Sequence, residues 1–264
     1  MDNHDSSDLD FPDFSEIIAE IQEYQRRVFD MMQQLRETLF PIIQVISQNA
    51  QNLSAVLIEA LRPLQIIAKL GNNQFVFWLP LPEDLANRIE KAEDVDRVLR
   101  EWFIEEDQYK IINETIENCV ASPSLKGHIH LFQQSVAAFK LGSFDLAATG
   151  FTSVIDGLLA DLSGLDTHKL SPRINAIMEK LEKDELLDSS EYAILTLGFT
   201  FKKTIESFSK TAPFSEPEPK LLNRHWIAHG RSTHPKTDLD CIKLIHLIYG
   251  MLLIDELGKS EVKN

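Results

Sequence analysis

Residues 223–231 bring together side chains that could do chemistry on a phosphate group. The stretch reads Asn-Arg-His-Trp-Ile-Ala-His-Gly-Arg and contains two arginines and two histidines. Arginine stays charged at neutral pH, and its planar guanidinium matches two phosphate oxygens. Histidine has an ordinary pKa of about 6.5, which suits it to give and take protons. The segment therefore predicts proton transfer at a phosphodiester, with Arg224 binding the phosphate and His229 acting as base or acid.

The local structure expected for this segment is a short helix that Pro219 opens and His229 ends, because Gly230 is a favourable C-cap. The dipole at the helix C-terminus would favour the charged form of the imidazole. Five positions on a regular helix correspond to a rotation of about 140°, so Arg224 and His229 would not share one narrow face. Either the long arginine reaches round the helix, or a second subunit completes the site.

Arg224, the polar His225, three further residues and His229 follow one another in the order arginine–polar–x3–histidine. In this motif the sequence resembles the HEPN superfamily, small helical bundles that include many metal-independent endoribonucleases. The upstream residues 130–162 are similar to the first helical hairpin of prophage-type members. The resemblance covers roughly residues 122–258 and leaves the N-terminal part of the chain unexplained.

The resemblance implies an endoribonuclease that cleaves RNA by transphosphorylation from the 2′-hydroxyl. It would need no metal or other cofactor, and its site would lie between the two subunits of a homodimer. Arg224 would bind the phosphate, and His229 would be the general base or acid. Asn223 and His225 would position the scissile group, and Arg231 would add to RNA binding. Such a protein would act as a toxin or a phage-defence effector, under the control of an antitoxin or another regulatory protein.

One departure from the family pattern bears on that control. Members that work as toxins beside a nucleotidyltransferase antitoxin often carry tyrosine two residues after the motif histidine. This chain has Arg231 at that position. We therefore expect a toxin that is neutralised in another way, or a stand-alone effector.

A stripe of polar side chains on the helix expected over residues 143–162 could support the motif. Acids in this helix of the family often approach the motif, so Asp156 or Asp145 could orient Arg224 or a histidine. The alternative is an ordinary solvated helix face. The stripe consists of Asp145, Thr149, Thr152, Ser153 and Asp156.

Two alternatives to a nuclease remain open. His225 and His229 have the i, i+4 spacing of a zinc site on a helix, with His234, Asp238 or Asp240 as a third ligand. No glutamate lies between the two histidines to act as a base, so we expect no metal here. The second alternative is a non-catalytic helical homodimer that binds protein, RNA or nucleotide.

The net charge of −15 is spread unevenly along the 264 residues. Residues 1–120 carry 23 acidic and 10 basic side chains, so most of the acidity lies in that part of the chain. Between residues 200 and 245, lysine and arginine outnumber aspartate and glutamate by eight to five. A basic patch of this kind can attract a phosphate ligand, although an ordinary mixture of solvated charges would look the same.

The chain as a whole is predicted to be all-α, in three parts. Residues 1–13 would be a disordered acidic tail, and residues 14–120 a helical region for oligomerisation or sensing. Residues 121–264 would be the HEPN-like helical bundle, with Pro123 at the boundary. The N-terminal region opens with long amphipathic helices, typical of a helical hairpin or a coiled-coil arm, and prolines keep residues 75–82 extended. The helices expected are 14–39, 42–70, 83–91, 95–119, 124–140, 143–162, 171–183, 189–209, the short helix ending at His229, and an apolar, central helix from Thr237.

Signals of export or of a membrane protein are missing from the sequence. The N-terminus is acidic where a leader would be basic and then apolar. No apolar run approaches the roughly 20 residues of a membrane helix. The two cysteines, Cys119 and Cys241, lie far apart, which is typical of buried thiols in a reducing compartment. We therefore expect a cytoplasmic protein without membrane attachment.

Overall fold

The structure is a computed structural model that describes residues 53–78, 81–167, 169–183 and 191–261. Because the description begins at residue 53, the predictions for residues 1–13 and for the helices before residue 53 lie outside the described residues. The chain divides into two compact units, residues 1–61 and residues 62–264. The second unit holds all of the described residues from Arg62 onward.

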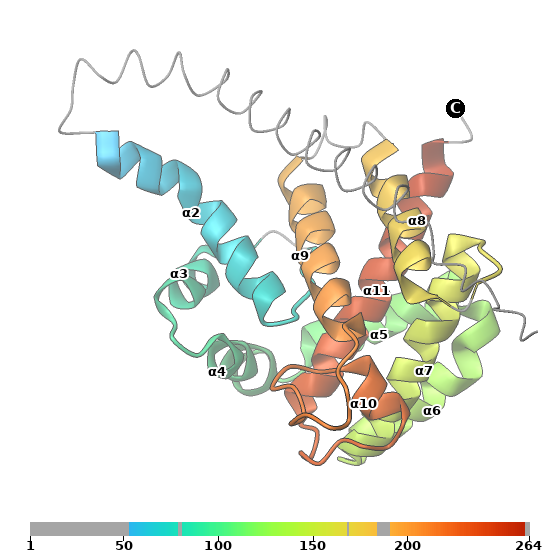
Figure 1. Ribbon diagram of the computed structural model, residues 1–264. Coiled ribbons are helices and arrows are strands. Elements are labelled where there is room, and N and C mark those ends of the chain that lie inside the picture. The colour runs from blue at the N-terminus through green and yellow to red at the C-terminus, as the bar shows by residue number, and fades with distance from the viewer. Residues whose placement is uncertain (1–52, 79–80, 168, 184–190, 262–264) are drawn as a thin grey trace, which may run out of the picture. The chain divides into compact units, whose positions relative to one another are not determined.

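Every regular element in the described part of the chain is a helix, which confirms the predicted all-α class (Figure 1). The helices lie close to the expected ranges, because periodic apolar residues and capping residues mark them locally. They are α2 (Leu53–Asn72), α3 (Glu83–Lys91), α4 (Val95–Arg100), α5 (Lys110–Ala121), α6 (Ile129–Lys140), α7 (Phe144–Ser163), α8 (Leu170–Lys183), α9 (Glu191–Ser209), α10 (Arg224–Ala228) and α11 (Asp238–Glu261).

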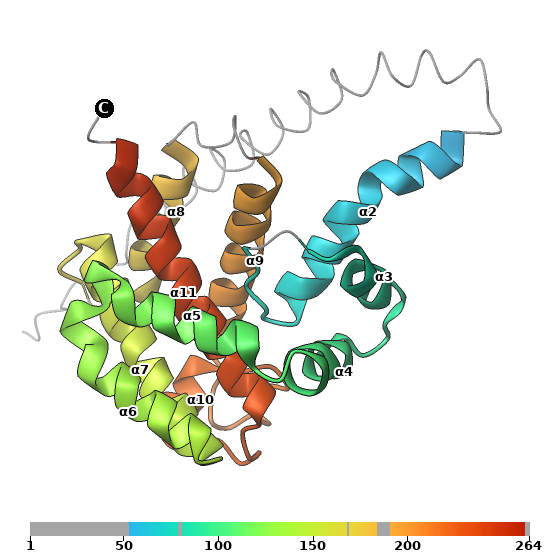
Figure 2. The same ribbon diagram turned by 180° about the vertical axis from the view of Figure 1, so that it is seen from behind.

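Helix α11 is the centre of the bundle. Thr237 and Asp240 cap its first turn reciprocally: the Asp240 amide donates to Thr237 Oγ1 at 3.2 Å, and the Thr237 amide donates to Asp240 Oδ2 at 2.9 Å. Most side chains between Leu239 and Leu252 are buried. Helices α7, α8 and α9 pack around it, and α5 crosses it from the side that faces the viewer in Figure 2. The prediction of an apolar, central last helix is thus confirmed.

Helices α6 and α7 form a tight antiparallel hairpin. Gly142 has a φ of 73° in the turn between them, a conformation that a side chain would strain. Farther along the pair, a Cβ on Gly150 would lie 2.1 Å from Ser135 Oγ, so the two helices could not approach this closely with alanine there. The hairpin holds α7 firmly, and α7 carries Asp156.

The helix expected over residues 95–119 is broken, so that prediction was wrong in its length. Helix α4 ends at Arg100, a π-helical segment follows over Glu101–Glu106, and Gln108 and Tyr109 have φ values of 53° and 62°. The left-handed residues redirect the chain, and Asp107 then caps α5 through the amide of Ile111 at 2.7 Å. The break lets α5 pack against α11, which a straight helix could not do.

The second compact unit runs through Pro123, where the sequence suggested a boundary. Arg100 Nη1 lies 2.5 Å from Asp238 Oδ1, and Lys243 Nζ lies 2.7 Å from Asp96 Oδ2, so two ion pairs join α4 to α11. Residues 75–78, part of the segment 75–82 that was predicted to be extended, form no helix, and the first three of them are buried in the common core. Residues 62–120 therefore share one core with the bundle that follows them.

His246 on α11 is buried within this common core. Its ring lies 4.5 Å from the ring of Phe75, 4.4 Å from that of Trp78 and 5.2 Å from that of Phe103. Its Nδ1 donates a hydrogen bond to the carbonyl of Val76 at 3.0 Å, and among the described residues Nε2 has no hydrogen-bond partner. Burial lowers the pKa of His246 to about 3, against a smaller opposing effect of the Val76 hydrogen bond, so the imidazole is uncharged at neutral pH.

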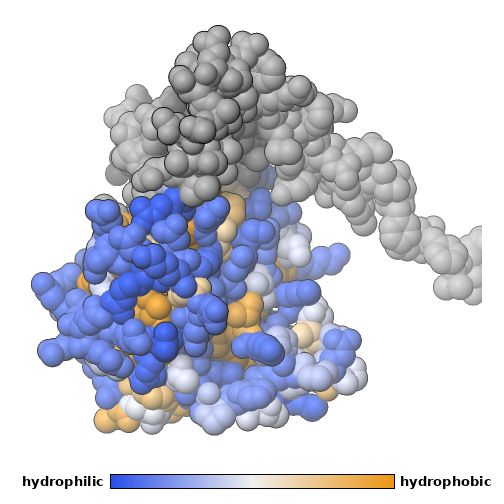
Figure 3. All heavy atoms as spheres, turned by 90° about the vertical axis from the view of Figure 1, so that its left-hand side faces the viewer, coloured by the Kyte–Doolittle hydropathy of each residue, from blue (hydrophilic) through white to orange (hydrophobic). Residues whose placement is uncertain are grey.

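One face of the described residues is mainly hydrophilic. Figure 3 shows the side of the molecule that carries α3 and α4, where hydrophilic side chains surround small apolar areas. Across the described ranges, no helix combines the length and the apolar character needed to cross a membrane.

Candidate functional site at helix α10

Helix α10 begins at Arg224, five residues later than predicted, because Asn223 caps it. The Asn223 Oδ1 atom accepts a hydrogen bond from the amide of Trp226 at 3.2 Å. Its Nδ2 donates to the carbonyl of Lys210 at 2.7 Å, and the side chain is buried. Pro219 lies in the loop before the helix. Asn223, which the resemblance assigned to positioning the scissile group, therefore holds the start of α10.

Gly230 ends α10 as the sequence predicted. It has a φ of 62°, and His229 is the C-cap. The Gly230 amide donates to the carbonyl of Ile227 at 3.0 Å, and the Arg231 amide donates to that of Trp226 at 2.9 Å. These two bonds form a Schellman motif, which satisfies carbonyls that the short helix leaves unpaired. The backbone alone thus fixes where His229 stands.

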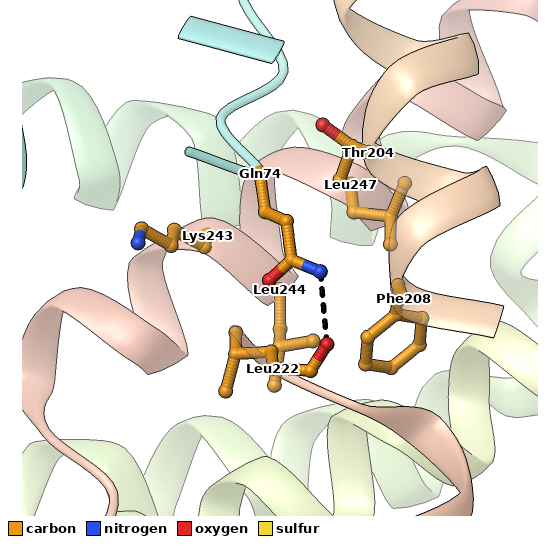
Figure 4. A pocket seen from close by; sticks show the side chains of 7 residues that line it. All are labelled: Gln74, Thr204, Phe208, Leu222, Lys243, Leu244 and Leu247. Carbon is orange, nitrogen blue, oxygen red and sulfur yellow. Dashed lines mark hydrogen bonds between the residues drawn. The ribbon is translucent and has the colours of Figure 1, made fainter. Parts of the chain in front are cut away.

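Buried side chains hold α10 against the core of the bundle. Trp226 and Ile227 are buried, and the helix packs against α7 and α9. Figure 4 shows how Gln74 supports the chain just before α10: its Nε2 donates to the carbonyl of Leu222 at 2.8 Å. The small pocket around Gln74 leaves no room for a water molecule, so it is part of the packing and no ligand site.

Arg224 forms an ion pair with Asp156, which lies 68 residues earlier in the chain. Its Nε lies 3.0 Å from both carboxylate oxygens, and its Nη2 lies 2.6 Å from Oδ2. The two side chains are 28% and 26% exposed, so the guanidinium is held and still meets solvent. Within the part of the chain that the structure describes, Nη1 makes no hydrogen bond. Arg224 can therefore bind a further anion without giving up Asp156.

The rest of the predicted polar stripe on α7 does not reach the motif. Asp145 Oδ1 accepts a hydrogen bond from the backbone amide of Lys236 at 3.0 Å and so supports the loop before α11. The hydroxyls of Thr149 and Ser153 bond to carbonyls of their own helix. Thr152 is fully buried. Of the two aspartates that the sequence suggested as partners of the motif, the structure brings Asp156 to it.

His225 and His229 lie next to each other on α10, with ring centroids 4.6 Å apart. A third ring, that of Phe214, stacks on His225 at 4.4 Å with an angle of 10° between the planes, and meets His229 edge-on at 5.8 Å. The guanidinium carbon of Arg231 lies 4.8 Å from the centroid of the Phe214 ring. Three of the predicted site residues thus gather around one phenylalanine.

Sequence reasoning missed Phe214. It lies in the loop between α9 and α10, where the surrounding residues 211–220 are otherwise small, polar or proline. A single large aromatic residue in such a loop was the available signal, because it has few other reasons to be there.

The environment of His225 favours the uncharged form of its imidazole. Burial lowers its pKa below the ordinary value, and the nearby His229 and Arg224 lower it further. A neutral imidazole can accept a hydrogen bond, which a charged one cannot. His225 can therefore accept a hydrogen bond from a ligand next to Arg224 and His229, which suits the positioning role that the resemblance implies for it.

The loop over residues 231–236 is organised by a buried carboxylate, that of Glu218. It accepts hydrogen bonds from the Ser232 hydroxyl, from the Thr233 amide and hydroxyl at 2.6 and 2.8 Å, and from His234 Nδ1 at 2.9 Å. Lys236 Nζ lies 3.3 Å away. Burial would raise the pKa of Glu218, but these hydrogen bonds outweigh burial and hold its pKa well below the ordinary range.

Replacing Glu218 with glutamine is expected to loosen this loop, because an amide cannot accept from so many donors at once. We expect a loss of about 1.5–3 kcal/mol in the free energy of unfolding. Hydrogen exchange should become faster at the amides of Thr233 and His234, while the core amides of α11 keep their rates. Unchanged exchange at these two amides would contradict the role given to Glu218.

The structure separates the ligands of the alternative zinc site. His234 binds Glu218 and is 73% exposed. Asp238 pairs with Arg100, and Asp240 caps α11. Across the described residues, no group of three or more histidine, cysteine, aspartate or glutamate side chains is arranged to hold a metal ion. His225 and His229 therefore face Phe214 without the third ligand that the zinc alternative needed.

No model of a protein family, no curated protein and no solved structure matches this chain. The candidate site itself combines a partly exposed arginine held by Asp156, the two adjacent imidazoles of His225 and His229, and a second arginine, Arg231, over the Phe214 ring.

Proposed function

We propose that this chain is a metal-independent endoribonuclease of the HEPN type, a toxin or phage-defence effector that acts in the cytoplasm as a homodimer. One observation carries the proposal: Arg224, held by Asp156, begins a short helix on which the rings of His225 and His229 lie side by side. Arginine beside paired imidazoles is the set of groups that RNA cleavage without a metal requires. An antitoxin or another regulatory protein would control the activity.

The proposed reaction is transphosphorylation. A neutral imidazole takes the proton of the 2′-hydroxyl, and the 2′-oxygen attacks the adjacent phosphorus. The bond to the 5′-oxygen breaks, and that oxygen receives a proton from the imidazolium that formed when the 2′-hydroxyl lost its proton. The products are a 2′,3′-cyclic phosphate and a 5′-hydroxyl. In this scheme Arg224 stabilises the charge on the phosphate, His229 transfers a proton, and His225 and Arg231 position and bind the RNA.

A second subunit is part of the proposal because the side chains of the motif contact different parts of the chain. Arg224 forms an ion pair with Asp156 of α7, whereas the rings of His225 and His229 contact the ring of Phe214. A copy of the chain facing this surface would bring a second arginine to the histidines. In a homodimer the two motifs would then form one cleft.

The purified full-length chain is expected to cleave RNA in the presence of EDTA. The new ends should be 2′,3′-cyclic phosphates and 5′-hydroxyls, which end-specific ligation and phosphatase treatment identify. Loss of cleavage in EDTA and its return with zinc would favour a metal site at His225 and His229 instead. Binding of RNA without cleavage would favour the non-catalytic helical module.

A further inference from the structure

We propose that Phe214 is the positioning residue of this site: its ring sets the orientation of His225 and His229 and holds Arg231 beside them. The inference rests on the proposed function, since it assigns a role within the same site. It depends on a residue that lies outside the arginine–histidine motif, on a loop between two helices.

The ring of Phe214 contacts the rings of His225, Trp226 and His229. Phe214 is half-buried, and its ring meets the ring of the buried Trp226 edge-on, with centroids 5.3 Å apart, so Phe214 is itself held against the core. His225 stacks on it nearly in parallel, and His229 meets it edge-on. Aromatic rings prefer these two arrangements over others, so the contact selects one orientation for each imidazole.

Helix α10 is too short to fix the orientation of the His229 side chain at its end. Helix α10 spans Arg224–Ala228, little more than one turn, and His229 at its end is exposed. A side chain at that position would otherwise sample several rotamers in solvent. Because proton transfer depends on closely held geometry, a residue that removes this freedom affects the rate.

The Phe214 ring also contacts the charged side chain of Arg231 and the titratable side chain of His225. Arg231 lies over the Phe214 ring, where a cation is attracted to the π-electrons. Stacking on His225 removes water from one face of that imidazole, and burial is the main reason why the pKa of His225 is lowered. Phe214 therefore helps to keep one imidazole uncharged while two arginines remain close by.

The test compares three variants of the full-length chain. Phe214→Leu removes the ring and keeps apolar volume, and Phe214→Tyr restores the ring. Phe199→Leu makes the same change at a phenylalanine of α9 that is 44% exposed and makes no ring contact with the site. Two quantities are measured: the pKa of His225 by NMR titration of its ring protons, and the pH profile of kcat and KM for RNA cleavage.

In Phe214→Leu we expect the pKa of His225 to rise toward its ordinary value and kcat to fall by roughly 10- to 100-fold. Phe214→Tyr and Phe199→Leu should both keep the His225 pKa and the kcat of the unmutated chain. In the unmutated chain the stacked ring should also shift the His225 ring protons upfield, a measurement that needs no variant. Unshifted ring protons, or an unchanged His225 pKa and kcat in Phe214→Leu, would overturn the proposal.

The failure of the nuclease proposal would look different. If the unmutated chain cleaves no RNA but the His225 pKa still rises in Phe214→Leu, then Phe214 positions the imidazoles of a binding site and the nuclease assignment falls. If RNA is cleaved and Phe214→Leu changes neither quantity, the nuclease stands and the positioning role falls.

Discussion

Replacing His229 with alanine is expected to slow RNA cleavage by roughly 10²- to 10⁴-fold, the usual cost of removing a positioned acid or base. The fold should persist, because backbone hydrogen bonds of Gly230 and Arg231 end α10 without help from the His229 side chain. His234→Ala is the matched control: it removes an exposed histidine that binds Glu218 outside the ring cluster. Initial rates of cleavage and circular dichroism measure the two effects. A His229→Ala chain that cleaves at the normal rate would contradict the catalytic role.

Arg224→Ala should cause a loss of similar size, and Arg224→Lys should not rescue it. The guanidinium holds Asp156 through Nε and Nη2, so a phosphate can bind at Nη1 at the same time. An ammonium is a point charge and cannot reproduce that planar, two-sided contact. In cells, the unmutated chain should slow growth on overexpression, while the Arg224 and His229 variants should be harmless. By light scattering these variants should show the same oligomeric state as the unmutated chain, which we propose to be a homodimer. If these variants aggregate instead, the two residues are structural and the binding module gains support.

Acid should destabilise the chain in part through His246, as the pH falls from about 6.5 toward about 3. The pKa of His246 is lowered to about 3 in the folded protein, so the unfolded chain binds a proton that the folded chain does not. The stabilisation is fully present above the ordinary pKa and is lost as the pH falls toward the folded value. The slope from one such group approaches about 1.4 kcal/mol per pH unit.

The variant His246→Asn provides the comparison. Its amide can donate to the Val76 carbonyl as Nδ1 does, but it does not titrate. We expect a less stable chain at pH 7, because the ring contacts with Phe75, Trp78 and Phe103 are lost, and a flatter pH dependence between pH 6.5 and 5. Urea unfolding at several pH values gives both quantities. Equal slopes in the two chains would show that His246 is not the group responsible.

The helices were predictable because their signals are local. Thr237 and Asp240 mark the start of α11, Gly230 marks the end of α10, and apolar spacing marks the buried face of each helix. Two boundaries were misjudged. The sequence suggested Pro219 as the first residue of α10, although Asn223 supplies the cap, and nothing in the helical pattern signalled the left-handed Gln108 and Tyr109 that separate α4 from α5.

By itself the sequence determined the all-α class and the candidate motif at Arg224 and His229, since capping, periodicity and motif spacing act within a few residues along the chain. Tertiary structure alone decided that Asp156 rather than Asp145 holds Arg224, that Phe214 stacks on His225, and that residues 62–120 share a core with the bundle. Contacts between residues so far apart depend on how the helices pack around α11, and no local pattern records that packing.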